Sequence, residues 1–340
     1  MRTEVIAVDP QRPDPAAIAR AADVLRAGGL VAFPTETVYG LGARADSDDA
    51  VRRVFAAKGR PAFNPLIAHV ASADHARRLA AAWPPPADRL AARFWPGALT
   101  LVVPWAAAGG ACEAVTGGGP TLAVRVPSHP VARALLAAVD FAVAAPSANR
   151  YQQLSPTTAA HVLKGLDGRI DLLLDGGPTT FGLESTVVDV TRDPPRLLRH
   201  GSLACDLLRL ALPALTVLDA PVDEAAGALP SPGMVRRHYA PRAPLARANA
   251  ADLDDVVAAL VASGLRPVGV VALDGTPVRA DDAVVARALP RDAEAYGRGL
   301  FAVLHGLDDL GCARIVVEDV PAGAAWASVR DRLARAAETP

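Results

Sequence analysis

The sequence predicts an α/β protein with two domains, the first built on a mixed sheet and the second smaller. A chain of 340 residues exceeds one comfortable hydrophobic core, and 51% of it is hydrophobic, enough to fill two. Helical and strand periods alternate in both halves, and a proline-rich stretch separates them. We therefore predict a first domain over residues 1–208, a linker over 209–244 and a second domain over 245–340.

The first elements alternate helix and strand. "DPAAIARAADVLRAGG" (14–29) has apolar residues at helical spacing and ends in glycines, and "LVAFP" (30–34) is a short buried strand stopped by proline. "SDDAVRRVFAAKGR" (47–60) begins with Ser47 as an N-cap and acidic residues in its first turn, so it predicts a helix.

Later strands in this half are short and closely spaced. Helices are expected at "HPVARALLAAV" (129–139) and "TTAAHVLKGL" (157–166), between strands at "PLIAHV", "LTLVVP", "TLAVRVP", "FAVAAPS", "LLLDGG", "STVVDVT" and "RLLRHG". This crowding favours a mixed sheet over a regular parallel one.

The second domain shows its own α/β order. "ADLDDVVAALVASG", "DAEAYGRGLFAVLHGLDDLG" and "ASVRDRLARAAE" are expected helices, and "PVGVVAL" and "ARIVVEDV" are expected buried strands. Because neither G-x-G-x-x-G nor a Walker pattern occurs here, motifs assign no nucleotide site to it.

Charge and cysteine content exclude several classes. A net charge of −1 argues against a protein that coats nucleic acid or an anionic membrane, although it is compatible with a local basic cleft. No apolar run approaches the roughly 18 residues of a membrane helix, and the start "MRTEVIAVDP" is unlike a signal peptide, so we expect a cytoplasmic protein. Cys112, Cys205 and Cys312 are too few and too far apart to predict disulfides or zinc ligands.

Candidate chemistry begins after the strand at 30–34. Thr35, Glu36, Thr37 and Tyr39 follow it and lead to Gly40 and Gly42, which predicts a strand-end loop whose hydroxyls and amides suit an oxyanion.

The next helix ends at Lys58, Gly59 and Arg60, and Lys58 is one of two lysines in a chain rich in arginine. These cations either complement the helix dipole in solvent or belong to the site.

Three later segments have the same polar character. Arg125 interrupts an apolar strand, so its side chain either reaches solvent at an edge or is a buried charge that awaits an anion. Hydroxyl, amide and charged groups also gather at Ser147, Asn149, Ser155, Thr157, Glu184, Ser185, Thr186 and Arg199. No G-x-S-x-G, H-E-x-x-H or Cys–His pattern accompanies them. Such a pocket suits phosphoryl or nucleotidyl transfer, in which positioning and charge stabilisation dominate.

Six motifs, in order, closely resemble those of the YrdC/Sua5 family of L-threonylcarbamoyladenylate synthases: "FPTETVYGLG", "KGRPAFNPLIAHV", "PSAN", "SPT", "ESTVVD" and "LRHG". The linker "SPGMVRRHYAP" and the second domain look like the two-domain Sua5 form. The resemblance implies a YrdC-like twisted mixed sheet with flanking helices, and a smaller Rossmann-like C-terminal domain.

The resemblance also implies a nucleotidyltransferase. It would condense L-threonine, bicarbonate and ATP to threonylcarbamoyl-AMP and pyrophosphate, for the t6A modification at position 37 of ANN-decoding tRNAs. Mg²⁺ would come with ATP, a downstream tRNA threonylcarbamoyl transferase would be the partner, and a weak direct tRNA contact is left open.

Matched position by position, the resemblance places L-threonine near Thr37, His69, Arg125, Ala145 and Ser185. It places ATP near Lys58, Arg60, Asn64, Thr121, Ser147, Ser155 and Arg199. Lys58 and Arg60 are the catalytic candidates, and Arg125 is the expected partner of the threonine carboxylate.

Two segments need separate comment. Where the family commonly has Ser-Gly after P-S-A-N-x, this chain has Tyr151 and Gln152, so the geometry of the loop is open. The linker carries Met234, Arg236, Arg237, His238 and Tyr239, an unusual set for a spacer. We predict that it is a lid over the active site, with His238 or Tyr239 touching ATP.

Two other functions were weighed. An RNA-binding or ribosome-maturation protein could use the same cationic cleft, but near-neutral charge and 4% aromatic residues count against it. Carbamoyl transfer in hydrogenase maturation would call for neighbouring modules whose cysteine motifs are absent.

Overall fold

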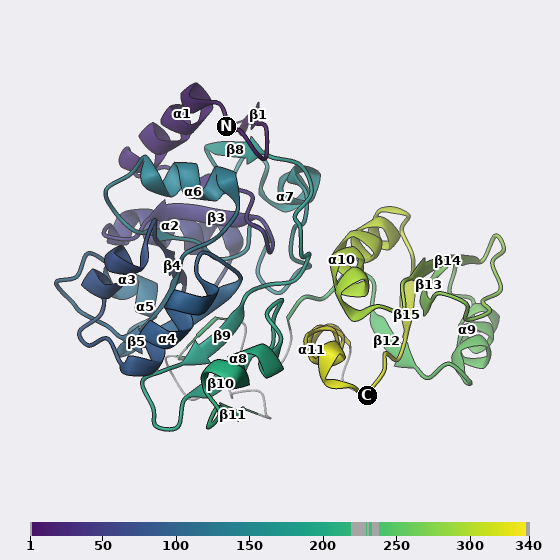
Figure 1. The fold of residues 1–340 in the computed structure, drawn as a ribbon. Coiled ribbons are helices and arrows are strands. Elements are labelled where there is room, and N and C mark those ends of the chain that lie inside the picture. The colour runs from purple at the N-terminus through teal and green to yellow at the C-terminus, as the bar shows by residue number, and fades with distance from the viewer. Residues whose placement is uncertain (1, 219–228, 230, 233–237, 338–340) are drawn as a thin grey trace. The chain divides into compact units, whose positions relative to one another are not determined.

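The computed structural model describes residues 2–218, 229, 231–232 and 238–337, and Figure 1 traces their course. The chain divides into two compact units. One comprises Met1–Tyr151 and Ser155–Arg236, and the other comprises Gln152–Leu154 and Arg237–Pro340. Within the described ranges, no helix is both long and apolar enough to cross a membrane.

The first unit contains a sheet of 11 strands in the order β1-β8-β2-β3-β7-β4-β6-β5-β9-β10-β11. The strands are β1 (Glu4–Ala7), β2 (Val31–Phe33), β3 (Gly40–Arg44), β4 (Ile67–His69), β5 (Leu99–Pro104), β6 (Thr121–Arg125), β7 (Val143–Ala144), β8 (Leu172–Asp175), β9 (Thr186–Asp189), β10 (Arg196–Arg199) and β11 (Thr216–Val217). β4 pairs with β6 in parallel, whereas β5 pairs with β6 in antiparallel orientation. The prediction of a mixed sheet is confirmed.

Helices cover both faces of this sheet. They are α1 (Pro15–Arg26), α2 (Asp48–Lys58), α3 (Ala73–Leu79), α4 (Pro85–Phe94), α5 (Glu113–Thr116), α6 (Pro130–Ala137), α7 (Ala159–Leu166) and α8 (Cys205–Ala211). Val31 and Phe33 of β2 pack in one apolar cluster with residues of α1 and α6, while Ala32 packs in another with α2. Alternate residues of a strand point to opposite faces, so β2 is buried on both sides. Ser47 caps α2 as predicted, accepting from the amide of Ala50.

The expectation that Gly40 and Gly42 lie in a loop is wrong, because both belong to β3. β3 pairs with β2 in antiparallel register, with Gly40 opposite Phe33 and Gly42 opposite Val31. A Cβ atom at Gly42 would come within 2.8 Å of the Phe33 ring and of Val143. The absence of a side chain at Gly42 therefore leaves room for Phe33 and Val143 from the neighbouring strands, and only residues 34–39 form the loop.

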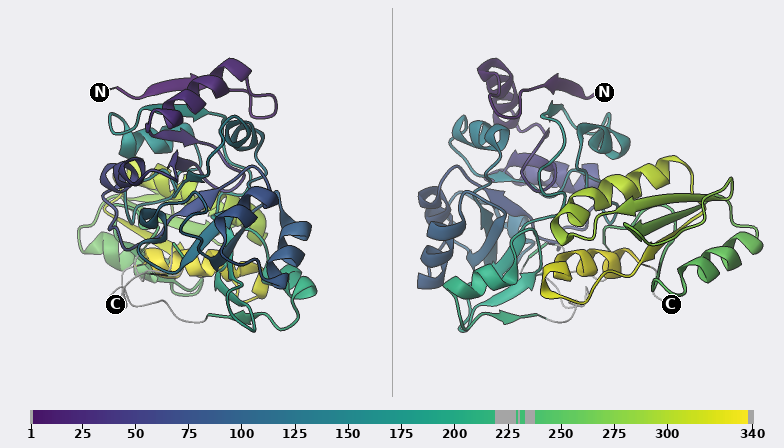
Figure 2. Two further views of the ribbon diagram at one scale, coloured as in Figure 1. Left: turned by 90° about the vertical axis from the view of Figure 1, so that its left-hand side faces the viewer. Right: turned by 45° about the vertical axis from the view of Figure 1, so that its right-hand side comes forward.

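The second unit has a four-stranded parallel sheet in the order β12-β15-β13-β14. Its elements are β12 (Leu245–Ala248), α9 (Leu253–Ala262), β13 (Val268–Leu273), β14 (Val284–Leu289), α10 (Ala293–Asp309), β15 (Arg314–Glu318), η2 (Ala324–Trp326) and α11 (Ala327–Ala336). Val268 and Val270 pack with α9, whereas the face at Gly269 meets Leu307 of α10. The two helices thus cover opposite faces of the small sheet, as Figure 2 shows, and the predicted helix-flanked α/β domain is confirmed.

Candidate active site

The loop after β2 folds into a hydroxyl-bonded turn. The Oγ1 of Thr35 accepts from the amides of Thr37 (3.2 Å) and Val38 (3.3 Å), and it donates to the carbonyl of Val38 (2.6 Å). Thr37 Oγ1 lies 2.8 Å from Thr35 Oγ1. Since the Thr35 proton is used on Val38, Thr37 donates to Thr35 and keeps its lone pairs for another donor. This turn fixes the Thr37 hydroxyl in a buried position.

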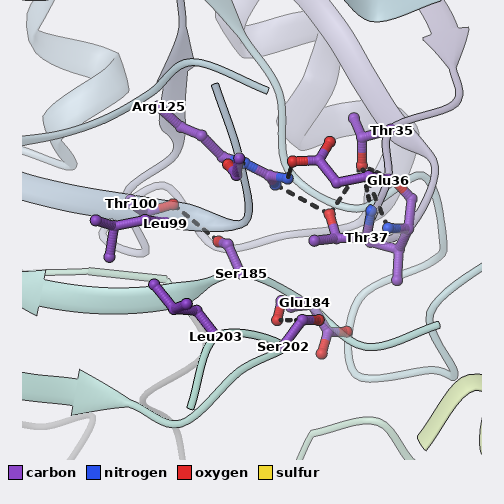
Figure 3. A network of polar contacts seen from close by, with 12 residues as sticks. Thr35, Glu36, Thr37, Leu99, Thr100, Arg125, Glu184, Ser185, Ser202 and Leu203 are labelled. Atoms are coloured by element: carbon purple, nitrogen blue, oxygen red, sulfur yellow. Dashed lines mark hydrogen bonds and ion pairs between the residues drawn. The ribbon is translucent and has the colours of Figure 1, made fainter. Parts of the chain in front are cut away.

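Arg125, the last residue of β6, supplies that donor. Its Nη1 donates to Thr37 Oγ1 (3.0 Å), its Nε donates to the carbonyl of Gly97 (3.2 Å), and its Nη2 lies 2.7 Å from Glu36 Oε1 (Figure 3). The side chain is only 4% exposed. The sequence left open whether Arg125 reaches solvent or is a buried charge, and the structure shows that it is buried.

Sequence reasoning missed that Glu36 is the counter-ion of Arg125. Burial pushes the pKa of Glu36 upward, but the charge and hydrogen bond of Arg125 outweigh burial and leave the pKa below its ordinary value. Glu36 is therefore ionised at neutral pH. A carboxylate between two threonines at a strand end was visible in the sequence, yet it lies 89 positions before Arg125, and no local pattern indicated the pairing.

His69 ends β4 directly opposite Arg125 in the β4–β6 register. Burial first, and then the charge of Arg125, lower the pKa of His69 to about 3, so the imidazole is neutral. Its Nδ1 lies 3.2 Å from the carbonyl of Ile67, and a neutral imidazole keeps one ring nitrogen as an acceptor. The amide of Ala145 donates to the same carbonyl (2.9 Å), so Ala145 lies beside this strand end.

Ser185 is placed by β5 and by Arg199. Its Oγ lies 2.8 Å from Oγ1 of Thr100, a hydroxyl in the apolar strand β5 that the sequence analysis overlooked. Arg199 donates to the Ser185 carbonyl from Nε (3.1 Å) and Nη2 (2.9 Å), and Nη2 is also 3.1 Å from Ser185 Oγ. A Cβ atom at Gly201 would lie 2.3 Å from the Thr186 amide, so only glycine lets the chain after β10 pass this close.

Four of the residues predicted for ATP, Lys58, Arg60, Asn64 and Ser147, lie around the end of α2. Lys58 is buried, and its Nζ donates to the carbonyls of Ser147 and Asn149 (both 2.5 Å). Burial, followed by the charges of Arg60 and Arg150, lowers the pKa of Lys58 well below its ordinary value. The alternative of a solvated helix end is therefore wrong for Lys58.

Arg60 and Asn64 contact each other and Tyr151. Arg60 Nη2 donates to Asn64 Oδ1 (2.6 Å) and to the carbonyl of Pro65 (2.8 Å). Asn64 Nδ2 is 3.4 Å from the hydroxyl of Tyr151, and the Arg60 guanidinium lies 5.9 Å from the Tyr151 ring centre. Tyr151, the departure from the family motif, thus lies against two of the predicted ATP residues.

Two other predicted ATP residues, Thr121 and Ser155, lie elsewhere in the first unit. Ser155 is buried and donates to Oε1 of Glu184, and Thr121 begins β6. The carbonyl of Pro232, in the linker, accepts from Arg199 Nη1 (3.3 Å).

His238 and Tyr239 belong to the second unit. There Tyr239 lies 5.9 Å from the Phe301 ring, with the Arg332 guanidinium 4.8 Å from its own ring centre. Met234, Arg236 and Arg237 lie outside the described residues, so the lid stays a prediction.

Gln152 adopts a left-handed backbone with φ of 65°, at the position where the family commonly has glycine. A side chain in this region is strained, so Gln152→Gly is expected to stabilise the protein by about 0.5 to 1 kcal/mol in urea unfolding. Gln153→Gly is the matched control, because no positive φ occurs there, and it should be neutral or destabilising. Equal effects of the two changes would contradict the strain.

Two family models cover most of the chain. The Sua5/YciO/YrdC model, described as "Telomere recombination", matches residues 23–201. The model described as "Threonylcarbamoyl-AMP synthase, C-terminal domain" matches residues 208–338.

Curated relatives and solved structures agree with these matches. "Threonylcarbamoyl-AMP synthase" of Pyrococcus abyssi is 39% identical over 322 residues, 93% of this chain and 92% of the relative. The Bacillus subtilis protein of the same name is 39% identical over 323 residues, 94% of this chain and 92% of its own. The structure of P. abyssi Sua5 complexed with L-threonine superposes with a TM-score of 0.90 at 38% identity, covering 99% of this chain and 100% of that one. The chain therefore belongs to the Sua5/YciO/YrdC family and has the two-domain Sua5 form.

Proposed function

We propose that this protein is an L-threonylcarbamoyladenylate synthase that condenses L-threonine, bicarbonate and ATP. The observation that carries the proposal is the buried arrangement of Arg125, Thr37 and Ser185, in a chain whose relatives bear that enzyme's name over nearly their full length. The product, threonylcarbamoyl-AMP, supplies the t6A modification at position 37 of ANN-decoding tRNAs. The transferase that consumes it, and a weak direct contact with tRNA, are parts of the same proposal.

The threonine side of the site binds the substrate by its carboxylate. Arg125 offers a planar pair of donors for carboxylate oxygens, and the hydroxyl of Thr37 contacts it. The hydroxyl of Ser185 contacts Thr100 of β5, the strand that pairs with β6. The neutral His69 adds an acceptor for a substrate hydroxyl or amine. Holding the substrate at both ends presents its amine to bicarbonate in one orientation.

The reaction then needs no nucleophile from the protein. The threonine amine attacks the bicarbonate carbon, water leaves, and a carbamate forms. A carbamate oxygen attacks the α-phosphorus of ATP, and the bond to the β-phosphate oxygen breaks with release of pyrophosphate. Because a carbamate is short-lived in water, the second step requires that the site exclude solvent.

The nucleotide side supplies cations, amides and hydroxyls for ATP. We assign this role to Lys58, Arg60, Asn64, Thr121, Ser147, Ser155, Arg199, His238 and Tyr239. Lys58 and Arg60 hold the ends of loops by donating to carbonyls, and we propose that the same charges stabilise the triphosphate. This donor set suits phosphate oxygens, so Mg²⁺ fits the site as part of ATP, held through the phosphates.

The linker completes the proposal as a lid. Pro232 meets Arg199, a residue of the nucleotide side, at the point where the "SPGMVRRHYAP" stretch begins. A lid at this place would keep water from the carbamate.

The decisive measurement is pyrophosphate release. With ATP, Mg²⁺ and bicarbonate present, pyrophosphate release is expected to require L-threonine. When the bicarbonate carbon is labelled, the label should appear in the nucleotide product. Omitting Mg²⁺ or adding a chelator is expected to abolish release. Release at the same rate without threonine would contradict the proposed function.

A further inference from the structure

Glu36 forms an ion pair with the Arg125 guanidinium. The Arg125 and Glu36 side chains are 4% and 5% exposed, and their charged atoms lie 2.7 Å apart. Figure 3 shows the carboxylate beside the guanidinium, next to the Thr35–Thr37 turn. The backbone of Glu36 is held as well, because its carbonyl accepts from the amide of Phe181 (2.8 Å). The carboxylate is therefore a fixed part of the threonine subsite.

The neighbours of Arg125 occupy only some of its hydrogen-bond donors. A guanidinium has five N–H donors. One on Nε serves Gly97, one on Nη1 serves Thr37, and one on Nη2 faces Glu36. Among the described residues this leaves one donor on each Nη, enough for the two oxygens of a substrate carboxylate.

The charge of this subsite sums to zero before substrate arrives. Glu36 is ionised and cancels Arg125, and His69 is neutral. A zwitterionic amino acid keeps the sum at zero. A carboxylate without an amine would add a second negative charge beside Glu36 and leave the buried site with one unbalanced negative charge, which is unfavourable.

We propose that Glu36 sets the charge selectivity of the subsite, so that Arg125 binds a zwitterionic amino acid and rejects a simple hydroxycarboxylate anion. The inference rests on the proposed function, since it takes the subsite at Arg125 to be the one for threonine. Glu36 acts through charge on the bound substrate and through its hold on Arg125, so it is a specificity-determining residue without a chemical step of its own.

The test compares three ligands by calorimetric titration of the full-length protein without ATP. L-Threonine is the zwitterion, (R)-3-hydroxybutyrate is the same skeleton without the ammonium group, and L-threoninol is the same skeleton without the carboxylate. In Glu36→Gln, the ratio of threonine affinity to hydroxybutyrate affinity is expected to fall on the order of tenfold, because hydroxybutyrate gains while threonine and threoninol lose. Arg199 and Glu184 are present in both proteins, so their charges cancel in the comparison.

Asp189→Asn is the matched control, because it removes another buried carboxylate that pairs with an arginine, at the far end of β9 from Ser185. It should leave the ratio unchanged. If Glu36→Gln does not fold, the affinity ratio is measured for Glu36→Asp instead. This variant keeps the negative charge and is expected to keep the preference for threonine.

Three results would overturn the proposal: an equal loss of all three ligands in Glu36→Gln, equal binding of threonine and hydroxybutyrate by the unaltered protein, or loss of the preference in Glu36→Asp. The first two leave the proposed function standing. Failure of the unaltered protein to bind threonine at all would reject the proposed function together with this inference.

Discussion

Arg125→Ala is expected to raise the KM for threonine about a hundredfold, while the KM for ATP changes by less than about threefold. In the proposed site the guanidinium would give charge-assisted hydrogen bonds to the threonine carboxylate, and the alanine side chain has no donor to replace them. Steady-state pyrophosphate release, with each substrate varied in turn, measures both constants. Equal losses for threonine and ATP would contradict the carboxylate role.

The same change should also destabilise the fold. Without Arg125, the Glu36 carboxylate is buried with no counter-ion, which costs about 3 to 5 kcal/mol of unfolding free energy. The double variant Arg125→Ala with Glu36→Gln removes that buried charge. It should therefore regain part of the stability while threonine binding stays weak, which separates the loss of folding from the loss of recognition.

Lys58→Met is expected to lower the free energy of unfolding by about 2 to 4 kcal/mol and to weaken ATP binding at least about tenfold. The Lys58 Nζ donates to the carbonyls of Ser147 and Asn149, and methionine leaves both acceptors without that donor. The loop from Ser147 to Asn149 would then shift, together with the hydroxyl of Ser147. Urea unfolding and calorimetric ATP titration measure the two effects.

Lys164→Met is the natural control, because Lys164 is the other lysine of the chain and lies exposed in the last turn of α7. Its loss should cost less than about 1 kcal/mol and leave ATP binding unchanged. Similar unfolding midpoints for the two variants would show that the hydrogen bonds from Lys58 to Ser147 and Asn149 do not stabilise the fold.

Local patterns predicted much of this fold. The apolar spacing and Ser47 cap of α2, and the long α10, follow from side-chain periodicity and capping, which act within a few residues. β3 was missed because the glycines of "GLGAR" have low strand propensity, and Phe33 and Val143, which leave no room for a side chain at Gly42, come from other strands.

The site was predicted in its residue types and less well in its pairings. Arg125 was identified as a charge within an apolar strand, Thr37 and Ser185 as hydroxyls at the ends of strands, and all three from the family motifs. The Arg125–Glu36 pair, the Ser185–Thr100 contact and the tie from Lys58 to the loop at 147–149 join residues about 85 to 90 positions apart, and no local pattern carries that information. Such contacts depend on the order of the strands in the sheet.

The neutral state of His69 has a consequence for how the enzyme responds to acidity. The pKa of Glu36 beside Arg125 lies below its ordinary value, and burial together with the charge of Arg125 lowers the pKa of His69 to about 3, so neither group exchanges a proton near neutral pH. The charges of Glu36 and His69 therefore stay constant over the physiological pH range. Any change of turnover with pH there would come from its reactants, through the fraction of threonine with a free amine and the balance between bicarbonate and carbon dioxide.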